Sequence, residues 1–172
     1  MSFLINKIGD TEPEIITLRE PIKFVGLSVK TDDKKIYKDA AQLGKDYSQF
    51  KKTYKITNIK EPWASVAYSR DFDEKTRSWE YIMGDIVTSL DSVPEGLKGY
   101  KIEPGEYAVF QIKAKFGFLW GLEIGRMKKY VFTDWLPKSK YTATGSDFEY
   151  HDERSIGKSP SIDLYVGIRE KE

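Results

Sequence analysis

The sequence predicts an α+β fold made of two pseudo-twofold-related β-α-β-β modules, with antiparallel sheets and two helices that flank a central cleft. The first observation behind this prediction is an internal match at a constant offset of 83 residues, the difference between Pro104 and Pro21. The matched positions include Glu20-Pro21 with Glu103-Pro104, Tyr47 with Tyr130, and Gly84 with Gly167. The second observation is that strand-like alternation and helix-like spacing follow each other in the same order in both halves.

We expect a single domain over residues 1–172 that is built from two modules, residues 12–91 and 96–170. The segment 92–99 contains Pro94, Gly96 and Gly99 and joins the two modules. A seam between two half-domains is a common place for a concave ligand site. The seam is therefore the first place to expect a functional site.

The first half begins with alternating apolar residues that are interrupted at Pro21, which indicates two strands separated by a bend. Asp32-Asp33 then provides an N-cap signal for a helix. Apolar residues at spacings of three and four predict an amphipathic helix of about five turns. The predicted elements, in order, are bent strands over 14–30, a helix over 36–54, and strands over 64–70 and 79–87.

The second half repeats this order, with a bend at residues 103–105. Its predicted elements are extended chain over 100–113, a helix over 116–132, and strands over 146–153 and 162–168. We expect Trp135-Leu136-Pro137 to end the helix, because proline cannot continue one.

The second predicted helix carries a stripe of three glycines, Gly117, Gly121 and Gly125, at intervals of four residues. Each glycine inside a helix costs about 1 kcal/mol relative to alanine, so the stripe requires a reason. One interpretation is that a flat ligand lies along this face against Trp120. The alternative is close packing of the helix on the sheet or on the other helix.

Glu149 is an acidic residue between two aromatic ones, in the stretch that reads Ser-Asp-Phe-Glu-Tyr-His. A regular hairpin would place Glu149 opposite Asp163, and two carboxylates on one face would form a cation-binding or proton-transferring pair. The alternation of apolar residues from 162 to 166 instead puts Glu149 on the outer face with Tyr165. A bulge in the hairpin would reverse that orientation.

Composition excludes several classes of function. Apolar residues are 40% and charged residues 32% of the 172, and the formal net charge is +1, so no broad basic surface for nucleic acid is indicated. No stretch reaches the ~20 apolar residues of a membrane span, and the N-terminus lacks the apolar core of a signal peptide. We expect a cytoplasmic protein with no membrane partner.

The chain has no cysteine and a single histidine, His151. Disulfides, thiolate metal sites and cysteine nucleophiles are therefore excluded. One histidine without a serine nucleophile motif argues against a hydrolytic triad, and no metal-ligand spacing or phosphate-binding glycine loop occurs. We expect no metal and no cofactor; haem bound through His151 is the remaining alternative.

Several motifs carry a family resemblance. Residues 135–141 (Trp-Leu-Pro-Lys-Ser-Lys-Tyr) and 146–150 (Ser-Asp-Phe-Glu-Tyr) resemble the "W-L-P-x-S-G-Y … P-D-F-E-x-Y" signature of the GyrI-like effector-binding domains. Residues 102–108 resemble that family's "I-P-x-G-x-Y" strand, and residues 79–84 resemble its "Y-x-x-G" strand. The resemblance covers about residues 13–170 and extends to drug-binding domains of multidrug-responsive transcription regulators and to integron cassette effector-binding proteins.

The chain departs from this signature at two positions. Lys140 replaces a glycine and Ser146 replaces a proline, so the turn between them is the part of the fold that the resemblance predicts least well.

The resemblance implies a stand-alone, effector-binding-like domain that binds small amphipathic molecules, cationic or aromatic, in a cleft between two half-modules. Glu149 occupies the family's "D-F-E" position, which lies inside the cleft, and this overrides the outward orientation from alternation. By position, the other ligand-binding residues are Trp120, Tyr37, Tyr68, Tyr81 and Tyr165. The expected partner is a small-molecule ligand.

Other functions remain open at this point. Family members are also fused to helix-turn-helix modules, but about a dozen residues before the first strand cannot hold one, so we expect no nucleic-acid binding by the chain itself. Some GyrI-like proteins hydrolyse reactive compounds, and here Glu149 would be the general base of such a hydrolase. A third alternative is a module that inhibits a protein partner of unknown identity.

Overall fold

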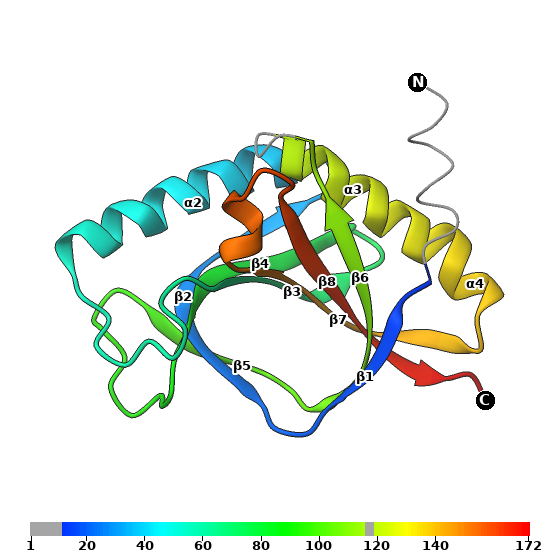
Figure 1. Cartoon of the computed structure of the whole chain (residues 1–172), viewed down its shortest axis with the longest axis horizontal. Coiled ribbons are helices and arrows are strands. Elements are labelled where there is room, and N and C mark those ends of the chain that lie inside the picture. Colours follow the sequence, from blue (N-terminus) through cyan, green and yellow to red (C-terminus); the bar gives the residue numbers. More distant parts are fainter. Residues whose placement is uncertain (1–11, 116–118) are drawn as a thin grey trace.

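A computed structural model describes residues 12–115 and 119–172. Within these residues, eight strands form one antiparallel sheet, and helices cover its convex side (Figure 1). The predicted α+β class, with antiparallel strands and two main helices, is confirmed. The strands of both halves join into a single sheet.

The elements follow the predicted order. They are β1 (Glu14–Leu18), β2 (Ile22–Asp32), α2 (Ile36–Thr53), β3 (Ser65–Asp73), β4 (Ser78–Ile86), β5 (Lys98–Ile102), β6 (Gly105–Lys113), α3 (Trp120–Tyr130), the π-helical turn η2 (Val131–Trp135), α4 (Leu136–Lys138), β7 (Tyr141–His151), the 3-10 turn η3 (Glu153–Ile156) and β8 (Ser161–Glu170). No helix within the described parts of the chain is both long and apolar enough to span a membrane.

The two halves exchange their outer strands. The strand order is β1-β6-β8-β7-β3-β4-β2-β5, so β1 pairs with β6 of the second half and β5 pairs with β2 of the first. The bends expected at Glu20-Pro21 and at residues 103–105 separate β1 from β2 and β5 from β6. Strands β3 and β7 pair along the middle of the sheet. Each half therefore completes the edge of the other.

The first helix forms as the sequence predicts. The Asp32 side chain accepts hydrogen bonds from the backbone N–H groups of Lys34 and Lys35 at 2.9 and 3.0 Å, which satisfies donors just before α2. Leu43 and Tyr47 are the buried residues of α2, one turn apart on the face that contacts the sheet.

The second helix continues further than predicted. Pro137 does not end it: α3 continues through η2 into α4, and the Leu136 N–H donates to the Val131 carbonyl in the π-helical turn. Pro137 is tolerated because it lies in the first turn of α4, where an amide hydrogen is not needed. The expected start of the helix, including Gly117, falls outside the described residues.

The two faces of the sheet have separate cores. On the helix-covered face, Met127 of α3 and Val131 of η2 pack in one cluster with Phe110 and Leu164. The other side, which we call the concave face, holds a ring-rich cluster that includes Phe24, Tyr68, Tyr100, Tyr107 and Phe148. There Phe148 stacks on Tyr165 with ring centroids 4.4 Å apart. Such an aromatic pair contributes about 0.5–1.5 kcal/mol beyond the area it buries.

Candidate functional site at the centre of the helix-covered face

The register of β7 and β8 determines where Glu149 lies. Glu149 pairs with Leu164, and Asp163 pairs with Tyr150, so the predicted pairing of Glu149 with Asp163 is wrong by one residue. The connection is not a regular hairpin, because it contains η3 and the Asp152 side chain accepts a hydrogen bond from the Arg154 N–H. Glu149 consequently shares the helix-covered face with Leu164, and does not share a face with Tyr165.

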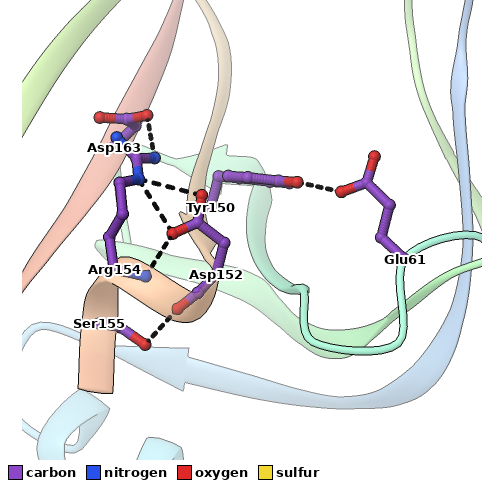
Figure 2. Close-up of polar contacts among 6 residues, drawn as sticks. All are labelled: Glu61, Tyr150, Asp152, Arg154, Ser155 and Asp163. Atoms are coloured by element: carbon purple, nitrogen blue, oxygen red, sulfur yellow. Dashed lines mark hydrogen bonds and ion pairs between the residues drawn. The ribbon is translucent and has the colours of Figure 1, made fainter. Parts of the chain in front are cut away.

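Asp163 points to the opposite side of the sheet and has its own partner. Figure 2 shows Arg154 between Asp152 and Asp163, with distances of 2.9 Å from Nε to Asp152 Oδ1 and 2.6 Å from its terminal nitrogen to Asp163 Oδ2. In the same view Tyr150 donates to Glu61, which joins β7 to the segment before β3. Asp163, Asp152 and Tyr150 thus each have a hydrogen-bond partner on the concave side of the sheet or in the loops beside it.

Glu149 itself is 3% exposed and lies below α3. Its Oε1 is 3.9 Å from the Lys128 ammonium, whereas its Oε2 is buried and has no hydrogen-bond partner among residues 12–115 and 119–172. Lys128 is closer to Asp147, at 2.9 Å from Oδ1. Asp147 and Glu149, two residues apart on one strand, point to the same face. We refer to them as the acid pair.

The electrostatics follow from this arrangement. Burial raises the pKa of Glu149; the Lys128 charge opposes this shift, and the Asp147 charge adds to it. Burial acts against the charge of Lys128, but attraction by Asp147 and Glu149 prevails and raises the pKa of its ammonium. Two carboxylates thus share one ammonium, and the cluster carries an excess negative charge when both acids are ionised.

Two of the predicted aromatic residues lie on the same face. Tyr81 of β4 is buried, and its pKa is raised by burial and then by the charges of Glu149 and Asp147. Trp120, the first residue of α3, meets the His151 ring edge-on at 6.4 Å between centroids. Burial lowers the pKa of His151.

Tyr37 of α2 explains two of the three stripe glycines. A Cβ atom on Gly121 would lie 3.3 Å from Tyr37 Cδ1, and one on Gly125 would lie 2.6 Å from Tyr37 Oη. The Tyr37 ring therefore lies directly against α3, where the starts of the two helices come together (Figure 1). The structure favours close packing on the other helix as the reason for Gly121 and Gly125.

The remaining two predicted residues lie elsewhere. Tyr68 and Tyr165 are on the concave face, across the sheet from Glu149. Tyr68 lines a cavity of about 280 Å³ with Tyr107 and Ser146. A larger cavity of about 460 Å³ lies beside α4 and β1. Glu149 lines neither of these cavities. Glu149 and Tyr81 share the helix-covered face, and Trp120 and Tyr37 come from the helices on that side, whereas Tyr68 and Tyr165 lie on the concave face.

Sequence reasoning missed Asp147 and Lys128. The signal for Asp147 was available, because alternation puts residues 147 and 149 on one face. Lys128 follows Trp120 and Ile124 at intervals of four residues, which places it on the same side of the helix. No group of three or more histidine, aspartate or glutamate residues suited to a metal ion occurs in the part of the chain that the structure describes.

Comparison with known proteins gives the family. The family model of the integron-associated effector binding proteins, Cass2, matches residues 15–168. A comparison with curated protein sequences found no match.

Solved structures share the fold. The integron cassette protein VCH_CASS2 of Vibrio cholerae aligns with a TM-score of 0.63 at 11% identity, over 92% of this chain and 96% of that one. SAV2435 bound to tetraphenylphosphonium aligns with a TM-score of 0.70 at 10% identity, over 92% and 94%. The C-terminal domain of EcmrR aligns with a TM-score of 0.61 at 11% identity, over 94% and 99%.

Proposed function

This chain belongs to the family of integron-associated effector binding proteins, and on that premise we propose that it binds a bulky, lipophilic monocation between α2 and α3. The observation that carries the proposal is the unpartnered Oε2 of buried Glu149. A buried carboxylate oxygen without a partner is unfavourable, and a cation that approaches it supplies the missing counter-charge.

The surroundings of Glu149 suit such a ligand. The acid pair has one ammonium for two carboxylates, so electrostatic attraction for one further positive charge remains. Tyr81 and Trp120 offer rings on the same face, and a cation over an aromatic ring gains about 0.5–2 kcal/mol. Apolar ligand surface that leaves water adds about 25 cal/mol per Å². Together these terms select charge and size and not one particular compound.

The relative SAV2435 supports the ligand class, since it was solved with tetraphenylphosphonium, a bulky aromatic monocation. In the present structure Lys128 covers the acid pair, and Tyr37 lies against Gly121 and Gly125 of α3. We propose that the ligand enters where these two side chains lie. Both are long side chains that rotate without disturbing the helices that carry them.

The proposal is tested by a paired titration with tetraphenylphosphonium and with neutral triphenylphosphine oxide. Replacement Glu149→Gln removes the charge and keeps the shape, so we expect affinity for the cation to fall about tenfold or more, which is about 1.4 kcal/mol. Affinity for the neutral compound stays within about twofold, because it gains nothing from the carboxylate.

The control is Glu95→Gln, which removes an acid from the exposed linker. It leaves both affinities unchanged. Equal losses for the cationic and the neutral compound in Glu149→Gln would contradict the role of charge, and binding of neither compound by the wild type would contradict the proposed function.

A further inference from the structure

The ammonium of Lys128 lies beside Glu149, in the position that the proposed function gives to the positive charge of the ligand. Among residues 12–115 and 119–172, it is the cation that forms ion pairs with both members of the acid pair. Its ammonium is 3.9 Å from Glu149 Oε1, the very carboxylate that the proposed function assigns to the ligand. A second positive charge in this space would be repelled by the first.

The two distances show how Lys128 is held. The ammonium is 2.9 Å from Asp147 and 1 Å further from Glu149, so Asp147 is its main anchor. The lysine side chain is 25% exposed and reaches the acid pair from α3 on a flexible four-carbon stem. Rotation of that stem toward solvent would free Glu149 without unfolding any backbone.

We propose that Lys128 is a built-in competitor: its ammonium occupies the cation position of the empty protein, and a cationic ligand binds by displacing it from Glu149. This inference rests on the proposed function. A tethered competitor reduces the affinity for every cation by the fraction of time that it leaves the position free. It thereby favours ligands whose apolar surface adds to the binding of the charge, and disfavours small hydrated cations.

The test is a titration of tetraphenylphosphonium into the wild type, Lys128→Met and Lys129→Met. Methionine keeps most of the apolar stem and removes the ammonium. Lys129 is the exposed neighbour on the same helix, so its replacement changes the net charge equally and serves as the control. We expect Lys128→Met to bind the cation about tenfold more tightly or better, and Lys129→Met to stay within about twofold of the wild type.

Lys128→Met leaves two buried carboxylates without their ammonium and could therefore fail to fold. A second variant keeps the test possible in that case. The double variant Lys128→Met, Asp147→Asn removes the lysine together with its main anchor and keeps Glu149. It too binds the cation more tightly than the wild type if Lys128 competes. The inference would be overturned if Lys128→Met is folded but binds the cation no more tightly than the wild type, and only the double variant binds it more tightly.

A direct readout follows the lysine itself. Acylation of amines, with peptide mass spectrometry, reports how exposed each ammonium is. When tetraphenylphosphonium binds, we expect labelling of Lys128 to rise and labelling of Lys129 to stay constant. A fall in Lys128 labelling would mean that the ligand covers the lysine, and that result overturns displacement.

The outcomes separate the two proposals. If the wild type binds the cation through Glu149 but Lys128→Met binds equally or less tightly, the competitor role of Lys128 is wrong and the proposed function stands. If the wild type binds the cation and Lys128→Met binds it about tenfold more tightly, both are supported. If no variant binds the cation, both are wrong.

Discussion

Glu149 is buried, although an acidic side chain is ordinarily exposed to water. Its carboxylate is buried, one of its oxygens has no partner among the described residues, and burial raises its pKa. A general base must reach a water molecule, and at 3% exposure Glu149 is shielded from bulk solvent. Either ligand binding or a reaction at this carboxylate therefore requires that the side chains above it, Lys128 first, move away.

The raised pKa has a consequence for stability. A carboxyl group whose pKa is higher in the folded than in the unfolded state binds its proton more tightly when folded. Its contribution to stability is greatest below the unfolded pKa, near pH 4, and declines as pH rises through the folded value. Replacement Glu149→Gln removes this decline.

We therefore expect Glu149→Gln to increase the free energy of unfolding at pH 7 by about 1–3 kcal/mol, because the neutral amide removes a buried charge that Lys128 compensates only in part. This corresponds to about 2–4 °C in Tm per kcal/mol for a chain of this size. The difference between variant and wild type shrinks toward pH 4. Thermal melts across this pH range measure it, with Glu95→Gln as the exposed control; a difference that grows toward acid pH would contradict it.

The orientation of Glu149 can be compared with the structure, whereas its role in binding stays a prediction. The resemblance placed Glu149 inside, and the structure buries it, whereas alternation alone gave the wrong face because it assumed a regular hairpin. The ion pair with Lys128 depends on a contact between a helix and a strand, and no local pattern encodes such a contact.

The helix α3 shows how an element accommodates a neighbour. Its glycines leave room for Tyr37, whose side chain is 59% exposed and can move into solvent. A Cβ atom added to Gly125 would meet the hydroxyl end of the Tyr37 side chain, which is flexible, and would not meet backbone atoms.

Replacement Gly125→Ala consequently moves the tyrosine and improves the helix. We expect the free energy of unfolding to increase by up to about 1 kcal/mol, the difference between alanine and glycine in a helix. Urea unfolding measures it, and Gly121→Ala, with its longer distance to Tyr37, is the matched comparison. A clear loss of stability in Gly125→Ala would mean that Tyr37 is held firmly in place against α3.

Most elements were predictable because each has its own period. The exceptions are irregular ones. The π-helical turn changes the hydrogen-bond register without changing the apolar spacing, so Pro137 appeared to end the helix. Strand β7 begins at Tyr141, five residues before the predicted start, because a register shift near Gly145 interrupts the alternation there.

The whole molecule is held together by exchanged strands. Periodicity of two residues identifies a strand but not its partner, so the sequence could not predict that β1 joins β6 and β5 joins β2. Each half depends on a strand of the other, and β3 pairs with β7 between them. The division into two modules, residues 12–91 and 96–170, remains a prediction about sequence and not about independent folding.

We expect the two halves to unfold in one cooperative transition. Trp63 and Trp79 report on the first half, and Trp120 and Trp135 report on the second. Variants that keep one pair and replace the other with phenylalanine should give the same urea midpoint when each is followed by fluorescence and by circular dichroism. Two separate midpoints within one variant would contradict the interlocked arrangement.

The sheet is symmetric in strand order, but its buried acids are not equivalent: Asp85 of the first half has an ammonium of its own, that of Lys51 at 2.9 Å, whereas the acid pair shares one. Across the central strand pair, Ala67 faces Glu149 and Ser69 faces Asp147, so both acids belong to the second half. This difference predicts how many cations the chain binds and how a bound cation is oriented. Two equivalent half-sites would take up two equivalents of a cation. Under the proposed function we instead expect this chain to saturate at one equivalent, with the positive charge of the ligand turned toward β7.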